Sequence, residues 1–109
     1  MSRRRTICSF LFVMGLMVLY GASNARADAA RGLVLAGQWC SQCHGVRPNE
    51  GSANPKAPTF QAIAAETSVT EISLRVFLRT PHSTMPNLML QPDDTDDIVD
   101  YLLSLKPRR

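Results

Sequence analysis

The sequence predicts a small all-α domain. Apolar residues recur at helical spacing in several segments of residues 28–109, and turn-forming residues separate these segments. No alternating apolar and polar run is long enough to indicate a β-strand. The chain has 109 residues, of which 45% are hydrophobic and 19% charged, and this composition suits one compact domain rather than a disordered chain or a multidomain enzyme.

The first 27 residues have the pattern of a secretory signal peptide. A basic start is followed by an apolar run from Ile7 to Tyr20 and by small residues that end in Ala25-Arg26-Ala27. The apolar run is shorter than the roughly 20 residues that cross a bilayer. We therefore expect cleavage before Asp28, export to the periplasm, no permanent membrane span, and a mature domain of residues 28–109.

The net charge of +3 does not indicate a surface that binds nucleic acid. Four arginines and no acidic residue lie in residues 1–27, which leaves 8 of the 12 basic side chains against all 9 acidic ones in residues 28–109. The expected mature domain is thus nearly neutral, and no nucleic-acid partner is expected.

The first helix is expected from about Ala29 to Gln42, because this stretch has apolar residues at near-helical spacing and contains no proline. The expected helix leads directly into the most specific motif of the chain.

Cys40, Cys43 and His44 form the motif Cys-x-x-Cys-His. Two thiols about one helical turn apart can each add to a haem vinyl group, and the adjacent histidine can offer a nitrogen to iron. The sequence therefore resembles a c-type cytochrome, which implies one haem c bound covalently through Cys40 and Cys43. A redox dithiol and a zinc site are the alternatives, but thioredoxin-type dithiols follow a strand, and zinc would need His82 as its fourth ligand.

Turn-forming residues from Gly45 to Pro58 predict a surface loop after the motif. A short helix is expected over Phe60–Ala65. The next helix is expected to begin with a capping box formed by Ser68 and Glu71 and to end at about Arg79. Its apolar face is expected to consist of Ile72, Val76 and Phe77.

The last helix is expected to start at Pro92. Acidic side chains near its start suit the positive end of the helix dipole better than a calcium site, which would want a glycine-containing loop. These acidic residues are Asp93, Asp94, Asp96 and Asp97. The apolar face of this helix comprises Ile98, Tyr101, Leu102 and Leu105.

The order of these elements over residues 29–106 resembles that of class I cytochromes c. The resemblance implies that Gly32 lies where the first and last helices cross. Ala36 stands where many members carry an aromatic residue, so we expect Trp39 or Tyr101 to fill the space. Trp39 is accordingly expected in the core or at the haem edge.

The same resemblance implies His44 and Met85 as the axial ligands of the haem iron, because Met85 precedes a proline as in the family's ligand loop. It also implies that the backbone carbonyl of Pro58 accepts a hydrogen bond from the His44 ring. Met89 and His82 are the alternative sixth ligands.

An iron with two protein ligands has no free position for a substrate, so the resemblance implies an electron carrier and not an enzyme. The expected partners are redox proteins, with a dehydrogenase or reductase as donor and an oxidase as acceptor. The carrier is expected as a monomer, or alternatively as the haem subunit of a periplasmic dehydrogenase or oxidase complex. A gas-binding or peroxidatic haem would require Met85 to be a labile ligand.

Overall fold

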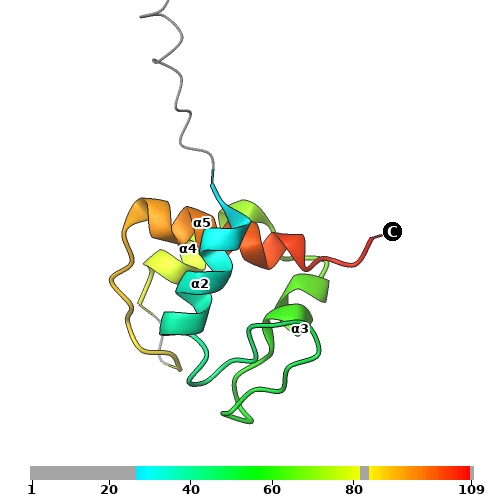
Figure 1. Ribbon diagram of the computed structural model, residues 1–109. Helices are drawn as coiled ribbons and strands as arrows, with labels where there is room; N and C mark the ends of the chain where they lie inside the picture. Colours follow the sequence, from blue (N-terminus) through cyan, green and yellow to red (C-terminus); the bar gives the residue numbers. More distant parts are fainter. Residues whose placement is uncertain (1–26, 82–83, 109) are drawn as a thin grey trace, which may run out of the picture.

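The computed structural model describes residues 27–81 and 84–108, which contain four helices and no strand. In chain order they are α2 (Ala29–Trp39), α3 (Phe60–Ala65), α4 (Glu71–Arg79) and α5 (Pro92–Ser104) (Figure 1). The predicted all-α class is therefore confirmed. Within the described ranges, no helix is long and apolar enough to cross a membrane. The signal-like residues 1–26 and His82 lie outside the described residues.

Helix α5 is the element against which the other three helices pack, and its most extensive contact is with α2. The two helices cross closely at Gly32 (Figure 1). A Cβ atom at Gly32 would lie 1.9 Å from the backbone oxygen of Asp97 and 2.7 Å from the Cβ atom of Tyr101. The predicted role of this glycine is thus confirmed, because any side chain here would push the helices apart.

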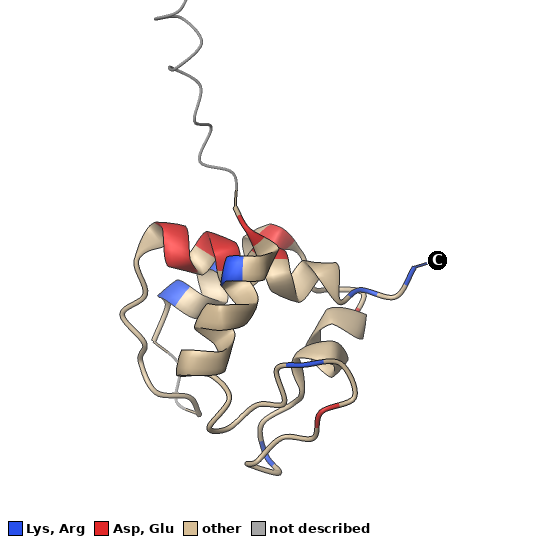
Figure 2. Cartoon of the chain, in the orientation of Figure 1, with Lys and Arg blue, Asp and Glu red and all other residues tan. Residues whose placement is uncertain are grey.

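Ion pairs surround the crossing, where acidic residues of α5 face basic residues of neighbouring helices (Figure 2). The Arg31 guanidinium of α2 binds the carboxylates of Asp94 and Asp97. On α4, Arg75 binds Asp96. The acidic residues at the start of α5 therefore have two roles. They lie at the positive end of the helix dipole, and they bind α5 to α2 and α4.

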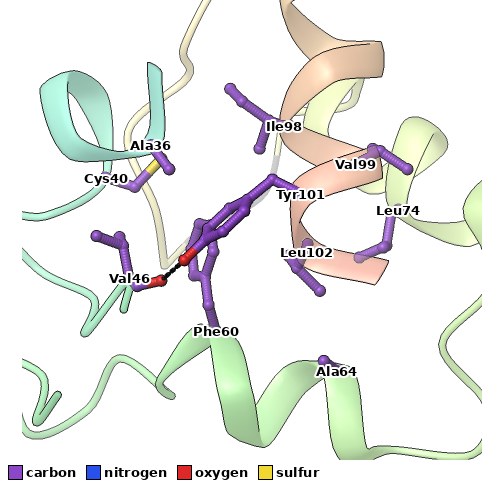
Figure 3. Packing of buried hydrophobic residues seen from close by; sticks show 10 residues of the cluster. All are labelled: Ala36, Cys40, Val46, Phe60, Ala64, Leu74, Ile98, Val99, Tyr101 and Leu102. Carbon is purple, nitrogen blue, oxygen red and sulfur yellow. Dashed lines mark hydrogen bonds between the residues drawn. The ribbon is translucent and has the colours of Figure 1, made fainter. Parts of the chain in front are cut away.

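The core lies where α5 meets the other three helices, together with Val46 of the loop that follows the cysteine motif (Figure 3). Tyr101 is only 6% exposed and lies among these buried residues, so it is the aromatic side chain that compensates for Ala36. Trp39 is 53% exposed, so the expectation that it lies in the core is wrong, while its alternative place at the haem edge stays a prediction. The buried hydrophobic residues are Ala36, Cys40, Val46, Phe60, Ala64, Leu74, Ile98, Val99, Tyr101 and Leu102.

Helix α2 ends at Trp39, earlier than the predicted end at Gln42. The amide of Ser41 donates to the carbonyl of Ala36 at 3.1 Å, and the Ser41 hydroxyl donates to the carbonyl of Gly37 at 2.6 Å. A continuing helix would pair the Ser41 amide with the Gly37 carbonyl. The serine side chain takes that acceptor instead, and the helix stops before the cysteine motif.

Helix α4 begins later than predicted, because its cap is Thr70 and not Ser68. The Thr70 hydroxyl accepts from the Ser73 amide at 3.1 Å, and the Ser73 hydroxyl accepts from the Thr70 amide at 2.8 Å. This reciprocal pair is a capping box shifted by two residues from the predicted one. The Val69 amide closes the turn that follows α3, which places Ser68 outside α4.

The close crossing predicts opposite effects for two glycine substitutions on the same helix. Gly32→Ala should reduce the free energy of unfolding by about 3 kcal/mol or more, because backbone atoms of α5 occupy the space. Gly37→Ala meets nothing within 4 Å and should increase it by about 0.5–1 kcal/mol. Guanidinium unfolding of the haem-loaded variants measures both, and equal stabilities would contradict the assigned crossing.

Candidate haem-binding site

The Cys-x-x-Cys-His motif forms a compact turn directly after α2. The amides of Cys43 and His44 donate to the carbonyl of Cys40 at 3.1 and 2.9 Å. Cys40 is buried and Cys43 is half-buried, and neither is part of a disulfide. Burial raises the pKa of the Cys40 thiol to about 11. Both thiols therefore lie in one turn with His44, and Cys40 belongs to the core.

A carbonyl oxygen fixes the orientation of the His44 ring. The Nδ1 atom of His44 lies 2.6 Å from the carbonyl oxygen of Pro58, as predicted for this pair. A carbonyl oxygen only accepts hydrogen bonds, so Nδ1 carries the proton and donates it. In the neutral imidazole this leaves Nε2 with its lone pair, which is the form that ligates a metal.

Two aromatic side chains form a chain of ring contacts that begins at His44. The rings of His44 and Phe60 meet edge to face, with centroids 5.8 Å apart and an interplanar angle of 61°. Phe60 in turn contacts Tyr101 of α5, at 6.4 Å between centroids (Figure 3). The orientation of the His44 ring is thus linked through Phe60 to the helix that organises the fold.

Hydrogen bonds hold the backbone that follows His44. The buried hydroxyl of Tyr101 donates to the carbonyl of Val46 at 2.6 Å (Figure 3). The Gly45 amide donates to the Ser52 hydroxyl at 3.0 Å. A Cβ atom at Gly45 would lie 2.2 Å from the backbone oxygen of Glu50, so the loop folds too tightly here for any side chain.

The carboxylate of Glu50 completes this arrangement. Its Oε2 atom accepts from the amides of Val46 and Arg47, both at 2.9 Å. These hydrogen bonds favour the ionised form, and they lower the pKa of Glu50. The sequence predicted the loop but not that Glu50 binds its backbone. The signal that could have indicated it is a glutamate three to four residues after the two amides that it binds.

Helix α4 carries an exposed apolar face. Ile72, Val76 and Phe77 were expected to form an apolar face, and they do, but all three are exposed. The core-facing residues of α4 are Leu74, which is buried, and Leu78, which is partly buried. Exposed apolar patches on small proteins often mark binding sites.

A hollow of about 400 Å³ opens on this face, lined by Ser73, Val76, Phe77 and Thr80. Haem is a large and mostly apolar ring, and an apolar helix face is a suitable wall for it. The donor set at the motif fits the same group, since two free thiols lie in one turn with a histidine whose Nε2 atom is available. The described residues therefore fit a covalently held haem.

The candidate sixth ligands lie on the segment between α4 and α5. Met85 is half-buried, whereas Met89 is 90% exposed and His82 is outside the described residues. In the view of Figure 1 the described part of this segment, residues 84–91, runs on the opposite side of α2 from α3. Among the described residues no group of three or more His, Cys, Asp or Glu side chains is placed to hold a metal ion.

The helical fold and the oriented histidine define the class of a small c-type haem protein. The protein-family model for cytochrome c matches residues 29–106. The chain is also 34% identical over 103 residues to cytochrome c-552 of Bradyrhizobium diazoefficiens, across 94% of this chain and 95% of that protein. No solved structure matches the chain significantly. The chain belongs to the cytochrome c family.

Membership of this family establishes what the site is for. The protein is a small cytochrome c, an electron carrier and not an enzyme. The family implies a covalent haem c, and Cys40 and Cys43 have the spacing that its attachment requires. It also implies redox proteins as partners.

The lowered pKa of Glu50 predicts a pH-dependent contribution to stability. A carboxylate with a depressed pKa stabilises the fold above its unfolded pKa of about 4.3, and this contribution is lost as the pH falls through the lower folded value. Glu50→Gln should therefore lower the melting temperature of the haem-loaded protein at pH 7 and flatten its acid-induced decline. Calorimetry between pH 7 and pH 3 measures both effects.

Glu66→Gln is the matched control, because Glu66 is an exposed glutamate just beyond α3. Its substitution should leave the pH profile close to that of the parent protein. Identical profiles for the two variants would contradict the role of Glu50 in holding the loop.

Proposed function

We propose that the protein is a periplasmic electron carrier that holds one haem c through thioethers of Cys40 and Cys43. In this proposal His44 and Met85 are the axial ligands, and the mature protein begins at Asp28. When bound, haem c supplies reversible one-electron oxidation and reduction. The single observation that carries the proposal is the hydrogen bond between His44 and the Pro58 carbonyl.

The chain's own residues prepare His44 for ligation. The Pro58 carbonyl keeps the proton on Nδ1, and Phe60 restricts the rotation of the ring. The hydrogen bond from Nδ1 makes Nε2 a more basic ligand for iron. A more basic ligand stabilises the oxidised, more positive iron and so lowers the reduction potential.

The apolar face of α4 has the opposite influence on the reduction potential. A haem placed against this face would have the low-polarity side chains of Val76 and Phe77 on one side, and they would exclude water from that side. Such surroundings penalise the additional charge of the oxidised iron and raise the reduction potential. A thioether ligand acts in the same direction, in contrast to a second histidine.

Met85 is the proposed sixth ligand because it is half-buried and precedes a proline. Met89 is almost fully exposed, which makes it the weaker candidate. With both axial positions taken by protein, electrons would be exchanged with partners through contact with the haem edge. A donor dehydrogenase or reductase and an acceptor oxidase are the proposed partners, and brief contacts over a small interface suit this exchange.

Export is proposed from the signal-like pattern of residues 1–27. Periplasmic oxidation of the two thiols to a disulfide would compete with haem attachment, so we propose that attachment takes place with both thiols reduced.

Substitution of the two methionines tests the ligand assignment. Met85→Ala should abolish the weak far-red sulfur-to-iron absorption band of the oxidised protein and lower its reduction potential, because a thioether ligand is lost. Met89→Ala is the matched control and should retain both properties. Absorption spectroscopy and redox titration of the haem-loaded variants measure these effects. Retention of the band in Met85→Ala and its loss in Met89→Ala would contradict the assignment.

A further inference from the structure

Asp28 joins α2 to α5 through its backbone as well as capping its own helix. Its carboxylate accepts from the amides of Ala30 and Arg31 at 2.9 and 3.3 Å, which caps α2. Its own backbone nitrogen donates to Oδ1 of Asp97 at 2.7 Å. The first residue of the expected mature chain is therefore bonded to the last helix.

The acceptor of this bond is a buried carboxylate. Asp97 is 5% exposed, and its other oxygen binds the Arg31 guanidinium. A buried carboxylate is costly unless charged or polar donors satisfy it. Among the described residues of the uncleaved chain, Asp97 is bound by one charged donor, Arg31, and by one neutral donor, the amide of Asp28.

The surroundings of Asp97 have an excess of negative charge. Two carboxylates, those of Asp94 and Asp97, share the single guanidinium of Arg31, while the Asp28 carboxylate is bound only by backbone amides of α2. These hydrogen bonds and charges raise the pKa of Arg31. The α4 cation that binds α5, Arg75, already pairs with Glu71 and Asp96. A second positive charge at the nitrogen of Asp28 would therefore be favoured.

The geometry points to a role for signal-peptide removal in completing the fold: cleavage before Asp28 creates an α-ammonium group that pairs with the buried carboxylate of Asp97. This inference rests on the cleavage site in the proposed function, but not on the haem ligands. Processing would then strengthen the contact between α2 and α5 on which the core depends.

The chemical step is hydrolysis of the peptide bond between Ala27 and Asp28 by a peptidase. One water molecule is consumed, the C–N bond breaks, and Ala27 keeps the carboxylate. Asp28 keeps the nitrogen, which is protonated at neutral pH because an α-amino group has a pKa of about 7.7–8.0. The hydrogen bond to Asp97 then changes from a neutral to a charge-assisted one, which is shorter and stronger.

The charged form is favoured in the folded state, so the pKa of the α-amino group should lie above its ordinary value. A group with a raised folded pKa stabilises the fold below its unfolded pKa, and the contribution disappears as the pH rises through the folded value. The additional stability of the mature form should therefore be present at pH 6.5 and absent above about pH 10.

The test compares two haem-loaded proteins, one that begins at Asp28 and one that retains Ala27. Retaining Ala27 moves the ammonium group by about 3.8 Å along the chain. At pH 7 the amine of Asp28 should be acylated roughly tenfold more slowly than that of Ala27, which corresponds to a pKa raised by about one unit. The protein that begins at Asp28 should also have the higher guanidinium midpoint at pH 6.5, and the difference should vanish at pH 10.

Two further preparations keep the result specific to Asp97. Acetylation of the folded protein at the Asp28 amine should remove the difference in guanidinium midpoint at pH 6.5 while leaving Asp97 unchanged. The Asp97→Asn variant should show an Asp28 amine that is no longer acylated slowly. Equal acylation rates, or equal midpoints at pH 6.5, would overturn the inference. Mass spectrometry of the exported protein should give Asp28 as the first residue, and another start would overturn the inference and the cleavage site while leaving the haem ligands untouched.

Discussion

The close crossing of α2 and α5 at Gly32 is the constraint on which the rest of the structure depends. It brings the backbone of α5 against α2 and places Tyr101 toward the loop that follows the cysteine motif. Through its contact with Phe60, Tyr101 is linked to the ring of His44, and its hydroxyl holds Val46. The orientation of the proposed haem ligand thus follows from a helix contact some distance away from it.

Several large apolar side chains of the domain lie outside its buried core. The buried cluster consists of ten hydrophobic residues, two of which are alanines, while α4 leaves Ile72, Val76 and Phe77 exposed. A domain of this size has little core volume and often depends on a cofactor for stability. A haem against the face of α4 would cover these side chains and add the largest apolar surface in the domain.

The sequence predicted the elements whose signals are local. The short helix after Pro58 and the start of the last helix at Pro92 depend on residues close together in the chain, and both are confirmed. The place of Gly32 at the helix crossing, which the family resemblance implied, is confirmed as well. The two shifted helix boundaries arose where serine hydroxyls had several possible partners. Ser41 captures a backbone carbonyl and ends α2 early, and Ser73 pairs with Thr70 instead of leaving the cap to Ser68.

The features that sequence reasoning missed depend on contacts between distant segments. Burial of Asp97 against Arg31, and exposure of Trp39, follow from how α2 and α5 are rotated about their axes, which helical spacing alone does not fix. The hydrogen bond from Tyr101 to Val46 spans 55 residues of chain. The Met85 assignment, by contrast, depends on the family resemblance and on the half-burial of this side chain, so it is a proposal.

The most direct test of the account is the visible spectrum of the protein matured with a haem-attachment system, in the oxidised and the dithionite-reduced state. Ligation by His44 and a methionine predicts sharp low-spin bands on reduction and a far-red sulfur-to-iron band on oxidation. A high-spin spectrum would contradict this account, because it would mean an open iron position and a site built for ligand chemistry. A protein that carries no haem would contradict covalent haem attachment itself, and it would favour a redox dithiol or a zinc site at Cys40 and Cys43.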